Sequence, residues 1–283
     1  MNVAIMGSQG MLGKAFVRSS GHGFNIIEAS RDNFDFTIKN KLYEFLDIEN
    51  PHVIINAAAN INMLYCEEHA SDTLKINVEF VQNLAEWCAI NNALLVQIST
   101  DHFYDYGGRL AHNEIDEIKI LNEYARQKYL AEKIATQTCK SLILRTSILG
   151  YRYSGKSTFI EWILKTIKTE SSISGFVNAY TSAIDVDSFV DIVFSCVDAR
   201  LTGCFNIGCA EVYSKYDLIK GVIAQLGNAD IILTSANVSE LYPKRASCCG
   251  LDSKKIEDEM GISLPTLDMV IENLKIQENY NAI

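Results

Sequence analysis

The first half of the chain alternates short apolar runs with longer stretches whose apolar residues recur at helical spacing. The apolar runs predict strands at residues 3–6, 24–27, 53–56, 94–98 and 142–144. The periodic stretches predict helices at residues 11–19, 39–46, 74–90 and 124–138. Near-continuous apolar strands that alternate with helices indicate right-handed βαβ units, and therefore a parallel sheet covered on both faces.

The pattern is looser after about residue 147. It predicts helices at 159–169, 187–197 and 215–226, and strand-like runs at 204–208 and 231–233. The chain has three prolines and no proline-rich linker that would mark a boundary. We therefore expect a first domain over residues 1–147 and a smaller α/β lobe over residues 148–283, some segments of which return to the first domain.

Composition and charge exclude several classes of protein. With 283 residues, 48% of them apolar, the chain can bury a substantial core, which excludes disorder as its main state. No apolar run reaches the roughly 18 residues that a membrane span needs. The N-terminus lacks the basic segment of a signal peptide, so we expect a cytoplasmic protein. The net charge of −10 argues against a nucleic-acid partner, although a helix N-terminus can still hold an anionic ligand.

The eight cysteines predict reduced, mostly buried thiols. They occur at positions 66, 88, 139, 196, 204, 209, 248 and 249, and none forms a C-x-x-C pair. Cys66 and His69 form a C-x-x-H pair, but no second ligand pair stands at zinc-finger spacing from it. We therefore expect no metal. The adjacent Cys248 and Cys249 are the thiols whose oxidation we would examine first.

A glycine motif follows the first predicted strand and opens the first predicted helix. Gly7 permits a tight turn, Gly10 lets the backbone approach a pyrophosphate, and Gly13 lets the helix pack closely on the strand. The helix N-terminus adds N–H groups and a positive dipole. The motif predicts a Rossmann-type doubly wound sheet that binds a dinucleotide through Gly7, Gln9, Gly10, Met11, Leu12 and Gly13.

The end of the second strand selects between the two nicotinamide cofactors. Ser30 and Arg31 stand where the 2′-phosphate of NADPH would lie, and a guanidinium binds phosphate through a two-pronged hydrogen bond. An acidic residue at this position would instead bind the ribose diol of NADH. Glu28 or Asp32 could do so if the strand ends elsewhere, so NADPH is favoured and NADH stays open.

A tyrosine and a lysine four residues apart stand on the helix predicted after the fourth strand. Residues at this spacing share one face of a helix, and an ammonium beside a phenol stabilises the phenolate. Tyr124 and Lys128 thus predict a proton donor for a carbonyl undergoing reduction. A hydroxyl in Ser99-Thr100, at the end of the fourth strand, could polarise that carbonyl. Tyr129 and Lys133 have the same spacing, and only the phase of the helix decides between the pairs.

Further motifs occur in a consistent order along nearly the whole chain. They are Asp35-Phe36-Thr37, Ile55-Asn56-Ala57-Ala58-Ala59, Cys66-Glu67, Ile76-Asn77-Val78, Ser99-Thr100-Asp101, Tyr124 with Lys128 and Glu132, Leu144-Arg145-Thr146-Ser147, Gly203-Cys204-Phe205-Asn206-Ile207-Gly208, Ser214-Lys215-Tyr216-Asp217-Leu218, and Arg245 with Leu251-Asp252. With the glycine motif, they make the chain resemble the extended short-chain dehydrogenases/reductases. The chain resembles most closely the dTDP-4-dehydrorhamnose reductase family.

The resemblance implies an oxidoreductase that uses NADPH to reduce the C4 keto group of a nucleotide-activated 4-keto-6-deoxy sugar, in deoxysugar and surface polysaccharide biosynthesis. It implies that Tyr124 protonates the oxygen, that Lys128 holds the nicotinamide ribose, and that Thr100 rather than Ser99 is the third catalytic residue. It places Asp35 near the adenine, Ala57, Ala58 and Ala59 along the cofactor cleft, and Asp101, His102, Arg145, Ser147 and Arg245 on the substrate side.

The departures from the family pattern lie on the substrate side. His102 stands where the family often has Tyr, Ile148 where it often has an aromatic residue, and Arg245-Ala246-Ser247-Cys248-Cys249 where it has R-P-x-N-S. The approach to the catalytic tyrosine, usually proline-rich, is Lys119-Ile120-Leu121-Asn122. A UDP-, GDP- or CDP-linked 4-keto sugar is therefore an alternative substrate to the dTDP-linked one.

Two other functions fit the same motifs. One is a related 4-epimerase or dehydratase of the extended family. The other is a catalytically silent NADP-binding regulatory subunit, similar to that of methionine adenosyltransferase, although an intact Tyr124, Lys128 and Thr100 argue against it. The expected partner is a nucleotide sugar, with no membrane involved. A homodimer is compatible with the sequence, which does not decide the oligomeric state.

Overall fold

The computed structural model describes residues 1–19, 23–32, 34–105, 107–152, 155–227, 230–238 and 241–280, with the backbone alone at 279 and 280. Its contacts divide the chain into two compact units. Unit 1 comprises Met1–Thr100, Ile120–Arg145 and Val190–Phe205. Unit 2 comprises Asp101–Lys119, Thr146–Phe189 and Asn206–Ile283. Both units are therefore assembled from several segments, and the grouping of residues 101–119 with unit 2 had no counterpart in the sequence pattern.

Unit 1 is built on a parallel sheet, as the sequence predicted. Its strands are β1 (Asn2–Met6), β2 (Asn25–Ala29), β3 (Val53–Asn56), β4 (Leu94–Ile98), β5 (Ser141–Thr146) and β10 (Gly203–Ile207), in the order β10-β5-β4-β3-β1-β2. The pairs from β2 through β1, β3 and β4 to β5 are parallel. The order reverses direction at β1, and this switch point is where sheets of this kind bind dinucleotides.

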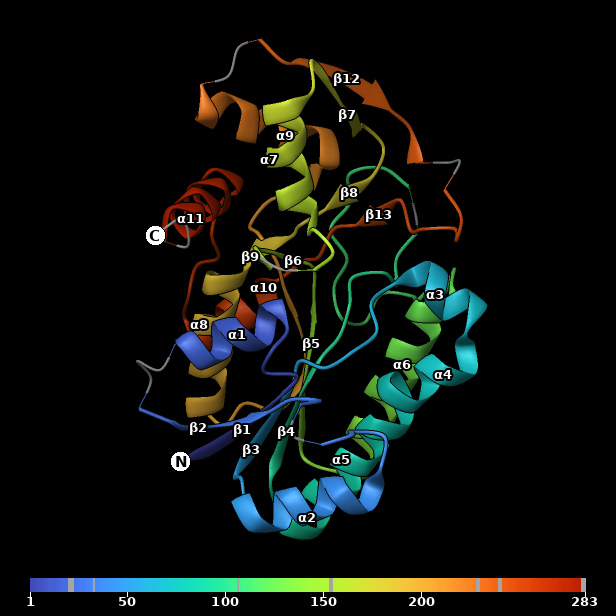
Figure 1. Cartoon of the computed structure of the whole chain (residues 1–283), viewed down its shortest axis with the longest axis vertical. Helices are drawn as coiled ribbons and strands as arrows, with labels where there is room; N and C mark the ends of the chain where they lie inside the picture. Colours follow the sequence, from blue (N-terminus) through green and yellow to red (C-terminus); the bar gives the residue numbers. More distant parts are fainter. Residues whose placement is uncertain are drawn as a thin grey trace. The chain divides into compact units, whose positions relative to one another are not determined.

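Helices cover both faces of this sheet (Figure 1). On one face, α1 (Met11–Arg18) meets the 190–198 part of α8 (Val186–Asp198), where the rings of Phe16 and Phe194 lie 5.4 Å apart at 79°. The other face carries α2 (Lys39–Glu49), α5 (Phe80–Asn91) and α6 (Glu123–Thr138). The helix expected over 74–90 begins earlier, as α4 (Ala70–Leu74) followed by one π-helical turn, η2 (Lys75–Glu79).

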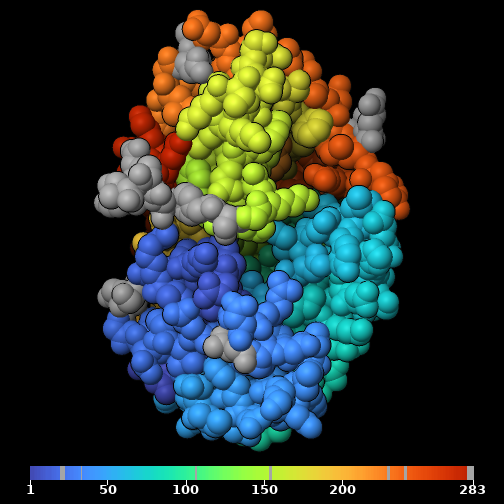
Figure 2. Space-filling model, viewed as in Figure 1, coloured from blue at the N-terminus to red at the C-terminus, as the bar shows by residue number. Residues whose placement is uncertain are grey.

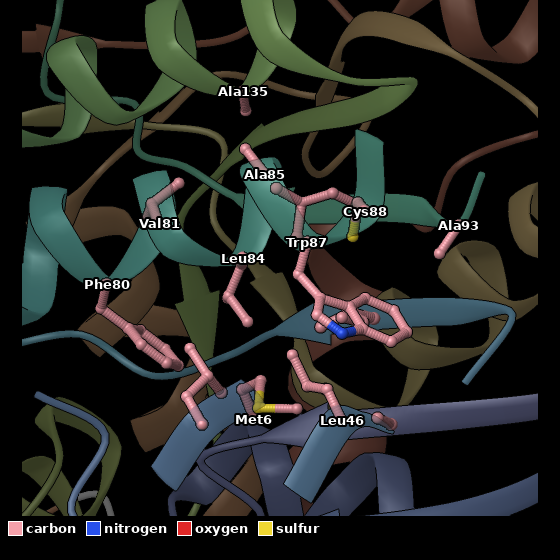
Figure 3. Packing of buried hydrophobic residues seen from close by; sticks show 14 of the residues in the cluster. Met6, Leu46, Phe80, Val81, Leu84, Ala85, Trp87, Cys88, Ala93 and Ala135 are labelled. Carbon is pink, nitrogen blue, oxygen red and sulfur yellow. The ribbon is translucent and has the colours of Figure 1, made fainter. Parts of the chain in front are cut away.

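The spacing of apolar residues on α5 explains the core of unit 1. Phe80, Val81, Leu84, Ala85 and Cys88 recur at helical spacing, and all are buried. Figure 3 shows these side chains facing Met6 of β1, Leu46 of α2 and Ala135 of α6. Trp87 is 2% exposed, and its indole N–H donates to Asp47 Oδ1 over 2.7 Å, which satisfies the ring's polar atom inside the core.

Unit 2 contains smaller sheets and four helices among its described residues. The strands are β6 (Ile148–Leu149), β7 (Ser172–Phe176), β8 (Tyr180–Thr181), β9 (Ile184–Asp185), β11 (Tyr213–Ser214), β12 (Ile232–Ala236) and β13 (Cys248–Cys249). They form the groups β11-β8-β13, β12-β7 and β6-β9. The helices are α7 (Phe159–Thr169), α9 (Lys215–Leu226), α10 (Lys254–Met260) and α11 (Leu267–Tyr280). Reciprocal caps, Thr158 with Glu161 and Ser214 with Asp217, explain why α7 and α9 begin where the sequence predicted.

Several elements were not indicated by the sequence pattern: α3 (Met63–Glu68), β7, α10, α11 and most of the two-residue strands. The α3 helix lacks a buried stripe, since Cys66 is buried while Leu64 and Tyr65 are 42% and 39% exposed. The surface of α3 and α4, drawn in cyan, lies open on the viewed side of unit 1 (Figure 2). Among the described residues, no helix combines the length and the apolar character that crossing a membrane requires.

Candidate active site

The loop between β1 and α1 has the tight geometry that its three glycines predicted. The amides of Gly7 and Ser8 both donate to the carbonyl of Ala29, at 2.8 and 3.0 Å, and this joins the ends of β1 and β2. Gly7 has φ +81°, which favours glycine. A Cβ on Gly13 would lie 2.1 Å from the Gly7 carbonyl oxygen, so only glycine lets α1 start against this turn.

The loop fits a dinucleotide pyrophosphate. Gly10 forms no side-chain cap on α1, so the first-turn amides of the helix remain available to an anion, as helix geometry requires. The Ser8 hydroxyl is buried and has no hydrogen-bond partner among the described residues. A buried orphan donor beside an open helix N-terminus is the arrangement that a bound phosphate would complete. In the same loop Gln9 and Gly10 are exposed, Met11 is half-buried and Leu12 is 9% exposed.

The residues expected to choose the cofactor follow β2 directly. Ser30 is buried, and its hydroxyl accepts a hydrogen bond from the Asp32 amide over 3.2 Å. Arg31 is exposed. Hydrogen bonds from the Thr37 hydroxyl and amide lower the pKa of Asp35, and the charge of Arg31 lowers it further. Directly after β2, the exposed Arg31 therefore follows the buried Ser30 in the chain.

Ala57, Ala58 and Ala59 follow β3 and are half-buried. The Ala57 amide donates to the Met6 carbonyl over 3.0 Å, and the Ala58 amide donates to the Asn56 side chain over 3.1 Å. A Cβ on Gly7 would lie 3.0 Å from the backbone of Ala58. The segment after β3 thus lies directly against the glycine loop.

The phase of α6 separates the two tyrosine–lysine pairs. Tyr124 and Lys128 are 7% and 4% exposed, whereas Lys133 is exposed and its ammonium lies over the Tyr129 ring at 5.0 Å. The Asn122 side chain caps α6 by accepting from the Ala125 amide over 2.9 Å. Tyr124 therefore lies in the first turn of a firmly capped helix, on its buried face.

Lys128 is held by the end of β4. Its ammonium donates to the Ile98 carbonyl over 2.6 Å. Burial lowers the pKa of Lys128 to about 8, although the negative charge of Glu132 opposes the shift. The next residues in the chain, Ser99 and Thr100, are 5% and 3% exposed. Lys128 of α6 thus contacts the end of β4 one residue before Ser99 and two residues before Thr100.

A buried ionic network lies one helical turn beyond Lys128. Arg145 makes a two-pronged contact with Glu132, with distances from 2.8 to 3.2 Å, and both side chains are about as buried as Lys128. The Ser99 hydroxyl donates to Glu132 over 2.5 Å. The sequence placed Arg145 beside the substrate, and the structure directs its guanidinium to Glu132 inside unit 1.

The remaining expected site residues belong to unit 2. Asp101 is 3% exposed, burial raises its pKa, and the Thr181 hydroxyl donates to it over 3.3 Å. His102 Nε2 lies 3.9 Å from an Asp101 carboxylate oxygen. Ser147 is half-buried, and its carbonyl accepts from the Ile184 amide over 2.9 Å. Arg245 is exposed.

The structure also assembles a group that the sequence analysis missed. One donor atom each of Asp101, His102 and Cys249 lie within 4.8 Å of one another, a spacing that suits metal ligands, where the sequence spacing had indicated no such cluster. Burial lowers the pKa of His102, and the positive charges of Lys215 and Arg245 lower it further. These positive charges act against a metal ion at this group.

Lys215 is the most informative residue that sequence reasoning overlooked. Its amide donates to the Ala179 carbonyl over 3.0 Å, and its ammonium lies 4.6 Å from the centre of the Phe159 ring. Burial lowers the pKa of Lys215, while Asp101 opposes the shift. In the sequence it stood within the motif Ser214-Lys215-Tyr216-Asp217-Leu218, directly after the cap of α9, and that motif does not reveal the chemistry around it.

Comparison with known proteins identifies the family. A family model described as RmlD substrate binding domain matches residues 1–277. The chain belongs to this family. This membership confirms the resemblance that the ordered motifs indicated.

Two relatives and one solved structure show which proteins this chain is similar to. A dTDP-4-dehydrorhamnose reductase of Aggregatibacter actinomycetemcomitans is 26% identical over 289 residues, with 96% of this chain and 97% of the relative covered. A probable low-salt glycan biosynthesis reductase Agl14 of Haloferax volcanii is 24% identical, with 95% of each chain covered. The crystal structure of dTDP-4-dehydrorhamnose reductase from Bacillus anthracis in complex with NADP has a TM-score of 0.90 at 20% identity, covering 98% of this chain and 99% of that chain. The structural likeness confirms the Rossmann-type fold.

Proposed function

We propose that this protein uses NADPH to reduce the C4 keto group of a nucleotide-activated 4-keto-6-deoxy sugar. The observation that carries the proposal is the buried pair of Tyr124 and Lys128 on α6, with the Lys128 ammonium bound to the end of β4. A protein that only binds a dinucleotide has no use for a buried tyrosine and a buried lysine four residues apart on one face of this helix. Family membership and relatives named as dTDP-4-dehydrorhamnose reductases support the same reaction.

The cofactor would be held by the residues around the glycine loop. The amides of the first turn of α1 and the Ser8 hydroxyl would bind the pyrophosphate. Ser30 and Arg31 would bind the 2′-phosphate that distinguishes NADPH from NADH, and Asp35 would lie near the adenine. Ala57, Ala58 and Ala59 would line the cleft through backbone and methyl contacts. When bound, NADPH supplies the hydride for the reduction.

Tyr124 would act as the general acid. Its hydroxyl would donate a proton to the substrate oxygen as negative charge develops there. Lys128 would keep its ammonium close to the phenol, stabilise the phenolate that remains, and hold the nicotinamide ribose. Thr100 would polarise the carbonyl by hydrogen bonding, since the Ser99 hydroxyl is already bound to Glu132.

The substrate would be recognised by side chains of unit 2. The negative diphosphate of a nucleotide sugar suits the positive charges of Arg245 and Lys215. Asp101, His102 and Ser147 would contact the sugar. Because His102 and Cys249 differ from the family pattern on the substrate side, the candidate substrates include UDP-, GDP- and CDP-linked sugars as well as dTDP-linked ones.

The decisive experiment follows NADPH oxidation by absorbance with a panel of dTDP-, UDP-, GDP- and CDP-linked 4-keto-6-deoxy sugars, with NADH in parallel. Turnover with one member establishes the reductase and names the nucleotide. Silence across the panel with retained NADPH binding would overturn the reductase and favour the regulatory subunit. Interconversion of 4-hydroxyl epimers without net NADPH consumption would favour the epimerase.

Replacement of Tyr124 by Phe tests the proposed acid. We expect kcat to fall by about 10²-fold or more, because a general acid contributes this much to proton transfer, while NADPH affinity stays unchanged. Tyr129→Phe is the matched control and should retain wild-type turnover. Near wild-type turnover of Tyr124→Phe would contradict the assignment.

A further inference from the structure

Two cysteines from distant parts of the sequence meet at one edge of the unit 1 sheet. Cys88 lies near the C-terminal end of α5, and Cys139 directly follows α6. Both helices precede neighbouring parallel strands, β4 and β5, so their C-terminal ends lie at the same edge of the sheet. The glycine loop follows β1 and therefore occupies the opposite edge. This thiol pair is thus separate from the proposed active site.

Both cysteines line one surface pocket, and Cys139 packs against the core cluster that contains Cys88. The pocket has a volume of about 430 Å³ and is lined by both cysteines together with Asn92 and Lys140. Cys88 is 1% exposed, and Figure 3 shows it on the core-facing part of α5. Cys139 is half-buried and packs against the same core. One thiol is therefore open to a reagent, and its neighbour is shielded from the solvent.

The surroundings make the two thiols unequal. The Cys139 thiol donates to the Ala135 carbonyl over 3.6 Å. The neighbouring Cys88 lowers the pKa of Cys139, whereas Cys139 and burial raise the pKa of Cys88. The thiolate is the reactive form in exchange with disulfides, so the more open thiol is also the one that ionises first. Lys140 Nζ, bound to Asn92 Oδ1 over 2.9 Å, adds positive charge to the pocket, which suits an anionic reagent.

The adjacent Cys248 and Cys249, which the sequence suggested for oxidation, have different surroundings. Both are buried, at 0% and 5% exposure. Cys248 Sγ lies 3.4 Å from the His112 ring nitrogen Nε2 and 3.4 Å from the Leu110 carbonyl oxygen. Residues that are distant in the sequence thus contact Cys248 inside unit 2, and both thiols are shielded from solvent.

We propose that Cys88 and Cys139 form a dithiol modification site that exchanges with small disulfides such as oxidised glutathione. The Cys139 thiolate attacks one sulfur of the reagent, forms a mixed disulfide and releases one molecule of glutathione. The Cys88 sulfur then attacks the Cys139 sulfur, the Cys139–glutathione bond breaks, and the departing glutathione sulfur takes up the Cys88 proton and leaves as a thiol. The protein gains one intramolecular disulfide, and the reagent is reduced to two thiols.

The test treats the reduced full-length protein with oxidised glutathione under native conditions, blocks the remaining thiols with iodoacetamide and maps the peptides without reduction. We expect a peptide linking Cys88 to Cys139. Because the link joins distant parts of the chain, the midpoint of thermal unfolding should also rise by several degrees and return after reduction. Separate alkylation of both cysteines would overturn the proposal.

Three variants distinguish the roles of the two thiols. Cys88→Ala should accumulate a stable glutathione adduct on Cys139, because the resolving thiol is missing. Cys139→Ser should form neither the link nor an adduct on Cys88, and Cys204→Ala, at the other half-buried cysteine, should form the link as the unchanged protein does. Absence of the adduct in Cys88→Ala, or a glutathione adduct on Cys88 in Cys139→Ser, would overturn the order of steps.

An independent probe uses phenylarsine oxide, whose trivalent arsenic binds two neighbouring thiols. The reduced protein should bind one equivalent at this pair, and Cys139→Ser should lose that equivalent while its circular dichroism spectrum stays unchanged. Retention of the equivalent in Cys139→Ser would overturn the site. None of these readouts depends on reductase activity, so failure of the proposed function leaves this inference intact.

Discussion

Three buried charged side chains determine much of the chemistry of unit 1. Lys128, Glu132 and Arg145 are each close to fully buried, where a charge is costly unless hydrogen bonds and opposite charges surround it. The structure supplies these through the Ile98 carbonyl and the two-pronged Arg145–Glu132 contact. The sequence pointed to Lys128 through its spacing from Tyr124, but it could not show which residues would neutralise Arg145.

The pH dependence of the reaction should follow Lys128. Burial lowers its pKa to about 8, so the ammonium required by the proposed mechanism is lost as pH rises through that value. We expect kcat/KM to be constant near neutral pH and to fall about tenfold per unit well above pH 8. Lys133→Ala should give the same profile, because Lys133 is exposed. A profile that stays flat to pH 10 would contradict the assignment.

The lowered pKa of Lys128 also determines how the free energy of unfolding changes with pH. Between pH about 8 and the ordinary lysine value of 10.5, the unfolded chain carries the Lys128 proton and the folded chain does not. Folding therefore releases a proton in this window, and the contribution of Lys128 to the free energy of unfolding increases as pH rises through it.

Replacement of Glu132 by Gln should strongly destabilise the protein. The change leaves the Arg145 guanidinium buried without its counter-charge, so we expect the free energy of unfolding to fall by about 3–5 kcal/mol in urea. Glu44→Gln is the control, since its pair with Lys41 is more than 60% exposed on both sides and should be worth less than about 1 kcal/mol. Equal effects of the two substitutions would show that Arg145 finds another partner.

The most accurately predicted helices and strands are those in which the apolar residues follow one clear spacing. The ranges of β1, β3, β4, α7 and α9 agree with the sequence pattern within about one residue, because apolar spacing and end caps agree there. The predicted start of the long helix before β4, at residue 74, was wrong. The helical segment begins at Ala70 and contains a π-helical turn at Lys75–Glu79 that no local pattern marks. The helices α3, α10 and α11 were missed, since their packing depends on distant segments rather than on local spacing.

The start of α1 depends on one glycine. A Cβ at position 13 would meet the Gly7 carbonyl oxygen at 2.1 Å, whereas one at Gly10 would meet it at 3.3 Å. We expect Gly13→Ala to lower the free energy of unfolding by about 1–3 kcal/mol through overpacking, and Gly10→Ala to lower it much less. Thermal and urea unfolding of the two variants measures the difference. Comparable stabilities would mean that the turn relaxes without cost.

Cofactor binding should raise the free energy of unfolding of the whole protein. A ligand at about 100 times its Kd adds about 2.7 kcal/mol to the free energy of unfolding, which raises the melting temperature by about 5 °C. We expect this shift with NADPH and a smaller one with NADH at equal concentration. Arg31→Ala should remove the difference, and Lys14→Ala, beyond the first turn of α1, should preserve it. A larger shift with NADH would assign the site to the other cofactor.

Much of this protein follows from local pattern. The parallel α/β architecture, the glycine turn, the Tyr124–Lys128 pair and the family resemblance all depend on residues a few positions apart, whose periodicity and spacing determine which face they share. Three features depend on tertiary structure: the pairing of Arg145 with Glu132, the gathering of Asp101, His102 and Cys249, and the position of Cys88 and Cys139 at one pocket. These groups come from segments that meet only after the strands have taken their order in the sheet, and strand order is a property of long-range packing rather than of local spacing.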